Sequence, residues 1–136
     1  MYEGTCHCGA VHWTHSGEPD SATTCNCKIC RRYGVMWIYG YDGDDIHVTG
    51  PVTGYIRQDL PDDEEPGITF DFCPTCGCVV SWRGLAPGKT GRTRTAVNIR
   101  LSEPETVAHL PIRHFDGLGT FDDLPDDGRR VHDMWF

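Results

Sequence analysis

Apolar and polar residues alternate along much of the chain with a period of two. Within 9–17, Val11 and Trp13 alternate with His12 and Thr14, as on a strand with one buried face. Six further short runs are rich in β-branched or aromatic residues and are bounded by Gly, Asp or Pro: 35–41, 45–49, 54–58, 67–72, 78–83 and 94–101. These seven runs predict an all-β fold.

Helix signals are scarce by comparison. One helical turn is predicted over 28–33, ending at Gly34, because glycine suits a helix C-terminus. The acidic stretch 59–65 is predicted to be a solvated loop, and the basic, glycine-rich stretch 84–94 either a mobile flap or a plain surface connection. From Ser102 onward, prolines, aspartates and glycines predominate, so we expect this part to wrap over the sheets.

Length and charge narrow the class of protein. At 136 residues the chain suits one domain, and we predict a single domain over 1–136. The start has no apolar segment flanked by basic residues, and the uncharged run 34–41 is far shorter than the ~20 residues of a spanning helix, so we expect a cytoplasmic protein with no membrane partner. The net charge of −8 argues against nucleic-acid binding, and an anionic substrate would need a local basic patch.

Cysteine is the residue type that carries candidate chemistry. Seven of the eight cysteines form three tight groups, CHCG at 6–9, CNCKIC at 25–30 and CPTCG at 73–77. A reducing compartment and the strain of bridging neighbouring cysteines favour metal ligands over disulfides, and zinc is favoured over an iron–sulfur cluster because ferredoxin-like spacing is absent. Two CxC or CxxC pairs can close a four-sulfur site. The three-cysteine group is one ligand short, so its fourth position falls to water, another side chain or a substrate.

These three groups, in this order and spacing, resemble the glutathione-dependent formaldehyde-activating enzyme (GFA) family, whose domain is shared with centromere protein V. The runs VNIRL (97–101), HFDG (114–117) and MWF (134–136) resemble the tail of many bacterial members. The resemblance implies two antiparallel sheets in a zinc-binding β-tent with little helix, and two zinc ions per chain. It implies a structural zinc held by Cys6, Cys8, Cys73 and Cys76, and a second, catalytic zinc held by Cys25, Cys27 and Cys30.

The resemblance also implies an activity, the condensation of glutathione with formaldehyde to S-(hydroxymethyl)glutathione, which is a carbon–sulfur lyase reaction in reverse. A zinc ion on three thiolates can hold a fourth thiol deprotonated. Lys28, Arg31 and Arg32 pair with glutathione carboxylates, favour the cysteine thiolates, or simply lie exposed on the helical turn. The alternative function is a zinc-stabilised module that binds glutathione or a protein without turnover. We expect a monomer or a homodimer.

Histidines and common catalytic motifs add little to this picture. His7 lies between two cysteines and would point to the opposite face of a strand, so we do not expect it to be a ligand. The remaining histidines show no HxxxH or HExxH spacing. GxSxG, Walker and dinucleotide fingerprints are also missing, which excludes the commoner hydrolase, nucleotide and hydride-transfer functions.

Four further sets of residues have open interpretations. The aromatic residues Trp37, Tyr39 and Tyr41 either wall a substrate pocket or pack in the core. Arg100 and Asp116 are expected to form a buried ion pair or to anchor a loop. The remaining cysteine, Cys78, is a spare ligand, a redox-sensitive thiol or, as we favour, a small buried hydrophobe.

Overall fold

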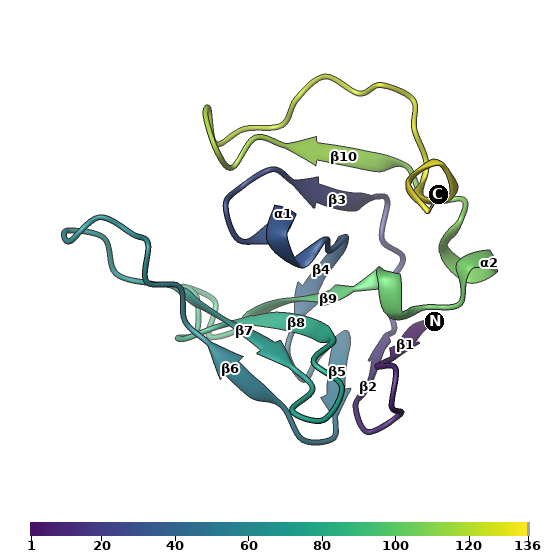
Figure 1. Cartoon of the computed structure of the whole chain (residues 1–136), viewed down its shortest axis with the longest axis horizontal. Coiled ribbons are helices and arrows are strands. Elements are labelled where there is room, and N and C mark those ends of the chain that lie inside the picture. The colour runs from purple at the N-terminus through teal and green to yellow at the C-terminus, as the bar shows by residue number, and fades with distance from the viewer. Residues whose placement is uncertain (136) are drawn as a thin grey trace.

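A computed structural model describes residues 1–135 of the chain, so Phe136 of the MWF motif lies outside the described residues. In the described residues, ten strands form two sheets, and the helical segments are single turns (Figure 1). Within the described part, none of the helices is long and apolar enough to cross a membrane. The mostly β architecture with little helix confirms the predicted fold class.

The smaller sheet is antiparallel, with the order β1–β2–β5. Its strands are β1 (Tyr2–Thr5), β2 (His12–His15) and β5 (Ile46–Thr49). The alternation within 9–17 is confirmed, because Val11 and Trp13 are fully buried while His12 and Thr14 are partly exposed. Gly4 pairs with Trp13 and lies under its indole, where a Cβ atom would be 2.5 Å from the ring, so only glycine fits.

The larger sheet has seven strands in the order β10–β3–β4–β9–β8–β7–β6. The strands are β3 (Ala22–Cys25), β4 (Trp37–Tyr41), β6 (Thr53–Tyr55), β7 (Ile68–Phe72), β8 (Val79–Gly84), β9 (Arg94–Asn98) and β10 (Ile112–Phe115). The pair β10–β3 is parallel, with Phe115 opposite Cys25, so the expectation of purely antiparallel sheets fails at this pair. Most of the chain separates the two strands, which leaves room for the crossover that a parallel pair needs.

Several strand boundaries differ from the prediction. The expected run 94–101 ends as a strand at Asn98, because the side-chain oxygen of Asn98 accepts the backbone N–H groups of Met36 and Arg100. A 3-10 turn, Ile99–Leu101, follows. The tail after Ser102 does more than wrap over the sheets, since β10 joins the larger sheet as an edge strand.

The helical turn predicted over 28–33 is confirmed as α1 (Cys30–Tyr33). It ends at Gly34, whose φ of 64° places it in the left-handed region that favours glycine. Two further single turns, α2 (Pro104–Val107) and the 3-10 helix Val131–Met134, lie in the tail.

The side chains of β4 divide between two buried clusters. Successive side chains of a strand point to opposite faces, so Ile38 packs with Trp13 and Val97 in one cluster, whereas Trp37 packs with Phe70 in the other. The second cluster also contains Cys27 and Cys30. The three-cysteine group is therefore built onto an aromatic core.

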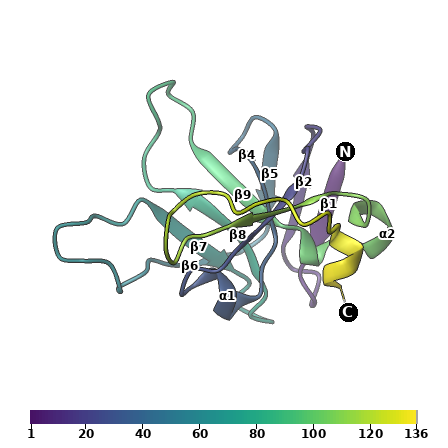
Figure 2. The ribbon, with the colours of Figure 1, turned by 90° about the horizontal axis from the view of Figure 1, so that it is seen from above.

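The two predicted loops connect neighbouring strands. The acidic stretch 59–65 is mostly exposed and belongs to a loop that projects away from the sheets (Figures 1 and 2). The connection between β8 and β9 is closed near its tip by a backbone bond of 2.9 Å from Gly88 N–H to the carbonyl of Arg92. Its last basic residue, Arg94, begins β9.

A C-terminal strap, residues 123–130, runs along the outer edge of β10, as Figures 1 and 2 show. Isolated bridges join Asp123 to Phe115 and Arg130 to Pro111, one at each end of β10. The strap therefore covers the edge that β10 would otherwise present to solvent.

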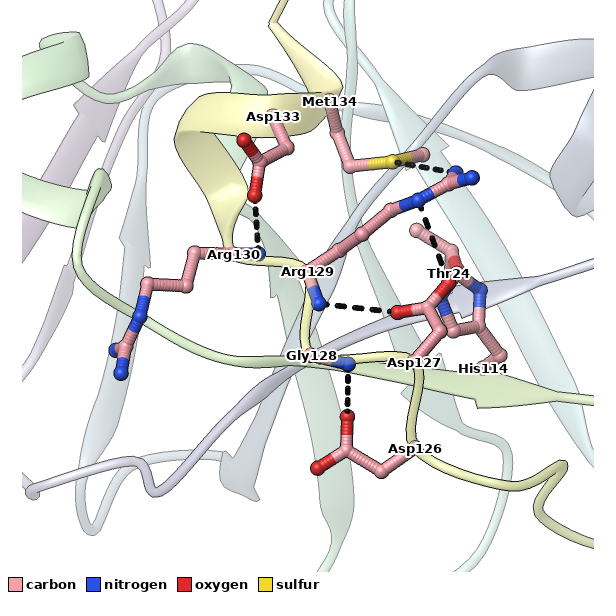
Figure 3. Close-up of polar contacts among 9 residues, drawn as sticks. All are labelled: Thr24, His114, Asp126, Asp127, Gly128, Arg129, Arg130, Asp133 and Met134. Atoms are coloured by element: carbon pink, nitrogen blue, oxygen red, sulfur yellow. Dashed lines mark hydrogen bonds and ion pairs between the residues drawn. The ribbon is translucent and has the colours of Figure 1, made fainter.

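Side chains connect the strap to the two strands beneath it (Figure 3). Asp127 accepts the backbone N–H of Arg129 at 3.0 Å, and its carboxylate lies 3.0 Å from His114 Nε2 on β10, without the alignment of a hydrogen bond. The other ring nitrogen of His114 is 3.2 Å from Thr24 Oγ1 on β3. The strap thus supports the strand that ends at Cys25.

Candidate metal centre

The first and third cysteine groups meet in one four-sulfur cluster. Cys6 and Cys8 follow β1, and Cys73 and Cys76 lie on the turn between β7 and β8; their four sulfurs all lie within 4.8 Å of one another. The Cys6–Cys8 and Cys8–Cys73 sulfur separations are 3.7 and 3.6 Å. Four thiolates at about 2.3 Å from a tetrahedral zinc are about 3.8 Å apart, so this donor set fits zinc.

Tight turns shape this cluster. Gly9 and Gly77 have φ values of 82° and 77°, and Gly77 N–H donates to the carbonyl of Cys73 at 2.9 Å. The N–H groups of Cys76 and Cys78 point at sulfurs and lower the pKa values of Cys73 and Cys76, the latter to about 5. A metal here would tie the hairpin of the smaller sheet to a hairpin of the larger one.

The middle cysteine group forms a separate three-sulfur cluster. Cys25 ends β3, Cys30 begins α1, and the sulfurs of Cys25, Cys27 and Cys30 lie within 4.8 Å of one another. The backbone N–H groups of Cys27 and Cys30 donate to the sulfurs of Cys25 and Cys27, each at 3.4 Å. The indole Nε1 of Trp37 donates to Cys30 Sγ at 3.5 Å.

The three thiols do not ionise alike. Hydrogen bonds from Cys25, then from Cys30 and from backbone N–H groups, lower the pKa of Cys27 to about 2. The pKa of Cys25 is raised, first by its hydrogen bond to Cys27, and the pKa of Cys30 is raised, first by its hydrogen bond to Cys25. A soft cation that replaces the shared protons suits this arrangement, so these residues also fit zinc, with three protein ligands and one open position.

The three-sulfur cluster opens onto a cavity of about 470 Å³. Six aromatic residues line the cavity together with the three cysteines: Trp37, Tyr39, Phe70, Trp82, Phe115 and Phe121. Both interpretations of the aromatic strand therefore hold for Trp37, which is buried and also faces the cavity. Tyr39 lines the cavity as well, whereas Tyr41 instead lies under the guanidinium of Arg92.

Three arginines line the same cavity, and their partners differ. Arg57 makes two bonds to Asp59, at 2.8 and 2.9 Å. Arg113 lies 3.7 Å from Asp123 and 3.9 Å from another carboxylate. The guanidinium of Arg94 lies 5.8 Å from the ring centres of Tyr39 and Trp82 and pairs with no carboxylate of residues 1–135.

The basic residues expected near the cysteines lie beside this cavity. Lys28 and Arg32 line an adjacent cavity of about 480 Å³, which shares Ile29 and Arg57 with the first, and Arg31 lines neither. Sequence reasoning missed Arg57, Arg94 and Arg113, because only the folded sheet brings them to the cysteines. Arg94 and Arg113 lie on β9 and β10, and Arg57 lies in the loop that follows β6. The basic stretch 84–94 was the one available signal for Arg94.

A turn from the tail packs directly on the three-sulfur cluster. A Cβ atom at Gly117 would lie 2.7 Å from Cys25 Sγ. The side-chain amide of Asn26, between two of the cysteines, donates to Asp116 at 2.9 Å. Hydrogen bonds, first from the N–H of Thr120, hold the pKa of Asp116 far below its usual value.

Most of the remaining candidates are structural. Asp116 is only partly buried and anchors its own turn, so the loop anchor is confirmed. The buried ion pair with Arg100 is wrong, because none of the ion pairs within residues 1–135 joins the two. Arg100 donates to the carbonyl of Met134 at 3.3 Å. Cys78 is partly buried against the core, outside both clusters, and His7 is exposed and outside them too.

One four-sulfur cluster links the two sheets, and a second, three-sulfur cluster lies beside a cavity. These features define a β protein whose cysteines suit soft metal ions. The family model described as glutathione-dependent formaldehyde-activating enzyme matches residues 1–109. The chain therefore belongs to the glutathione-dependent formaldehyde-activating enzyme family.

Solved structures support the fold. The crystal structure of a Rhodobacter sphaeroides protein is similar, with a TM-score of 0.56 and 24% identity over 81% of this chain and 98% of that chain. Among curated proteins, none matches the chain. Family membership and the cysteine clusters together fit a glutathione-related zinc protein.

Proposed function

We propose that this protein catalyses the reversible addition of a thiol to a carbonyl carbon, with glutathione and formaldehyde as the reactants. The observation that carries the proposal is the three-sulfur cluster with one position open toward a cavity. The family supports it, since its description names both glutathione and formaldehyde. The four-sulfur cluster has a full set of ligands, so its role in this proposal is structural.

When bound by Cys25, Cys27 and Cys30, zinc would supply a positive centre that holds a substrate thiol deprotonated. Trp37 and the backbone N–H groups fix the three cysteine sulfurs, so the ligands need not reorganise during the reaction. The aromatic walls exclude water from the reacting sulfur and carbonyl carbon.

The addition itself needs little acid–base chemistry. A carbon–sulfur bond forms as the carbonyl double bond opens, and the proton lost by the thiol is balanced by one that the oxygen takes from water at the cavity mouth. In the reverse direction the same groups release the aldehyde.

Binding of the thiol would depend on local charge. The chain has a net charge of −8, so a glutathione carboxylate is attracted only where cations gather. Arg94 at one side of the three-sulfur cluster and Lys28 with Arg32 in the adjacent cavity provide such places. Glutathione carries its carboxylates at both ends and its thiol between them, which suits this distribution.

The reaction needs reduced cysteines, so we place the protein in the cytoplasm. Its partners in this proposal are small thiols and aldehydes. Neither a membrane nor a nucleic acid is a partner in this proposal. We propose that the protein is a monomer or a homodimer.

Exchange NMR on an equilibrium mixture of formaldehyde, glutathione and their adduct tests the proposal. The zinc-loaded protein should accelerate exchange, and Cys27→Ser should abolish the acceleration. Cys78→Ser is the matched control, because Cys78 lies outside both clusters and should leave the rate unchanged. Saturable glutathione binding without acceleration would instead favour a zinc-stabilised binding module.

A further inference from the structure

Phe121 has an unusual combination of backbone and exposure. Among residues 1–135 it is alone among the non-glycine residues in having a positive φ, 56°, a region that bulky side chains rarely adopt. Its side chain is also 77% exposed. Burial in the core therefore does not account for a large aromatic residue at this position.

The turn that carries Phe121 is firmly built. The Asp116 carboxylate accepts the N–H groups of Gly119 and Thr120, at 3.0 and 2.9 Å, and the Asp116 carbonyl accepts the N–H of Phe121 at 2.8 Å. Asn26 connects this turn to the three-sulfur cluster. The strained position of Phe121 is thus fixed relative to the cysteines.

This geometry places the ring of Phe121 at the cavity. Phe121 lines the cavity and packs edge-on against Phe115, with ring centres 5.0 Å apart. Phe115 pairs with Cys25 across the parallel strands, and Gly117, four residues before Phe121, lies against Cys25 Sγ. An apolar surface therefore stands beside the sulfurs, at the rim where a substrate would enter.

Formaldehyde does not use such a surface, because its carbon carries only hydrogen. We propose that Phe121 and Phe115 receive an aromatic group on the carbonyl reactant, so that the site handles adducts of glutathione with aromatic aldehydes as well as with formaldehyde. This inference rests on the proposed function. The chemistry is the same as with formaldehyde. Sulfur bonds to the carbonyl carbon as the carbon–oxygen double bond opens. The thiol loses one proton and the oxygen gains one, so no further reactant is needed.

Two ligands that cannot react test the binding step by calorimetry. S-benzylglutathione resembles the benzaldehyde adduct without its hydroxyl, and S-methylglutathione resembles the formaldehyde adduct in the same way. The protein should bind S-benzylglutathione about tenfold more tightly than S-methylglutathione, and Phe121→Ala should remove most of that preference, since an aromatic pair contributes a factor of this order. Leu118→Ala is the control, because Leu118 lies on the same turn, is 54% exposed and does not line the cavity.

Equal affinity for the two ligands, absence of binding, or a preference that survives Phe121→Ala would each overturn the inference. Exchange NMR with benzaldehyde and with formaldehyde then distinguishes failure of this inference from failure of the proposed function. Acceleration with formaldehyde alone defeats the inference and keeps the proposed function. Acceleration with benzaldehyde alone contradicts formaldehyde as the reactant and keeps the assignment of Phe121 and Phe115 to an aromatic aldehyde. Without acceleration for either aldehyde, both fail.

Discussion

The indole nitrogen of Trp37 donates a hydrogen bond to the sulfur of Cys30 over 3.5 Å, at a position where Trp37 is almost completely buried. This hydrogen bond joins the aromatic wall of the cavity to the three-sulfur cluster. N–H donors that point at a ligand sulfur stabilise its negative charge and fix its direction. Trp37 is therefore a positioning residue for Cys30 as well as part of the core.

We expect Trp37→Phe to weaken zinc binding at the three-sulfur cluster about tenfold, because loss of a hydrogen bond to a metal ligand has effects of this order. Competition with a chromophoric chelator measures the affinity. Trp13→Phe is a useful control: it also removes an indole from the core, but the buried Trp13 Nε1 has no hydrogen-bond partner within residues 1–135. An equal loss in both variants would assign the effect to packing.

The two cysteine clusters should respond differently to removal of one ligand. Cys73→Ser should prevent stable folding, because Cys73 is fully buried and its cluster joins hairpins of both sheets. Cys27→Ser should leave the sheets intact and reduce the zinc content from two ions to one. Circular dichroism and metal analysis by mass spectrometry measure both effects. If Cys27→Ser unfolds as completely as Cys73→Ser, the second cluster is structural and the proposed function loses its main support.

The sequence predicted the local features that depend on short spacing. Alternation located β2, and Gly34 located the end of α1, because each reflects a property of neighbouring residues. The division of the cysteines into two sets was also predicted, and the structure brings each set together.

Features that depend on distant parts of the chain were missed. The parallel pairing of β10 with β3 brings Phe115 beside Cys25, yet nothing in the local pattern of either short strand specifies that partner. The same holds for Arg57 and Arg94, which reach the cavity only through the folding of the larger sheet. Phe121 was missed for another reason, since its positive φ depends on hydrogen bonds to Asp116.

The turn anchored by Asp116 should depend on pH in a defined range. Its pKa is lowered in the folded state, first by the N–H of Thr120 and then by Asn26, so its stabilising contribution is complete above its ordinary pKa of about 4 and is lost as pH falls toward the lower folded value. Asp116→Asn should therefore lower the melting temperature by a constant amount between pH 8 and about pH 5, and by progressively less below about pH 4. Thermal melts of both proteins across this range measure the difference. A difference that grows toward acid would contradict this assignment.

Arg94 should select thiols that carry a carboxylate, because it lines the cavity and lacks a carboxylate partner within residues 1–135. Arg94→Gln should weaken glutathione binding about tenfold, the usual order for a hydrogen bond to a charged group, and should leave binding of cysteamine, which has no carboxylate, little changed. Calorimetry with both thiols measures this selectivity. Arg92→Gln is the matched control, since Arg92 lies two residues away, pairs with Asp44 at 2.6 Å and stands outside the cavity. Equal losses for both thiols in Arg94→Gln would show that Arg94 shapes the cavity through its packing on Tyr39 and Trp82 and does not bind the carboxylate.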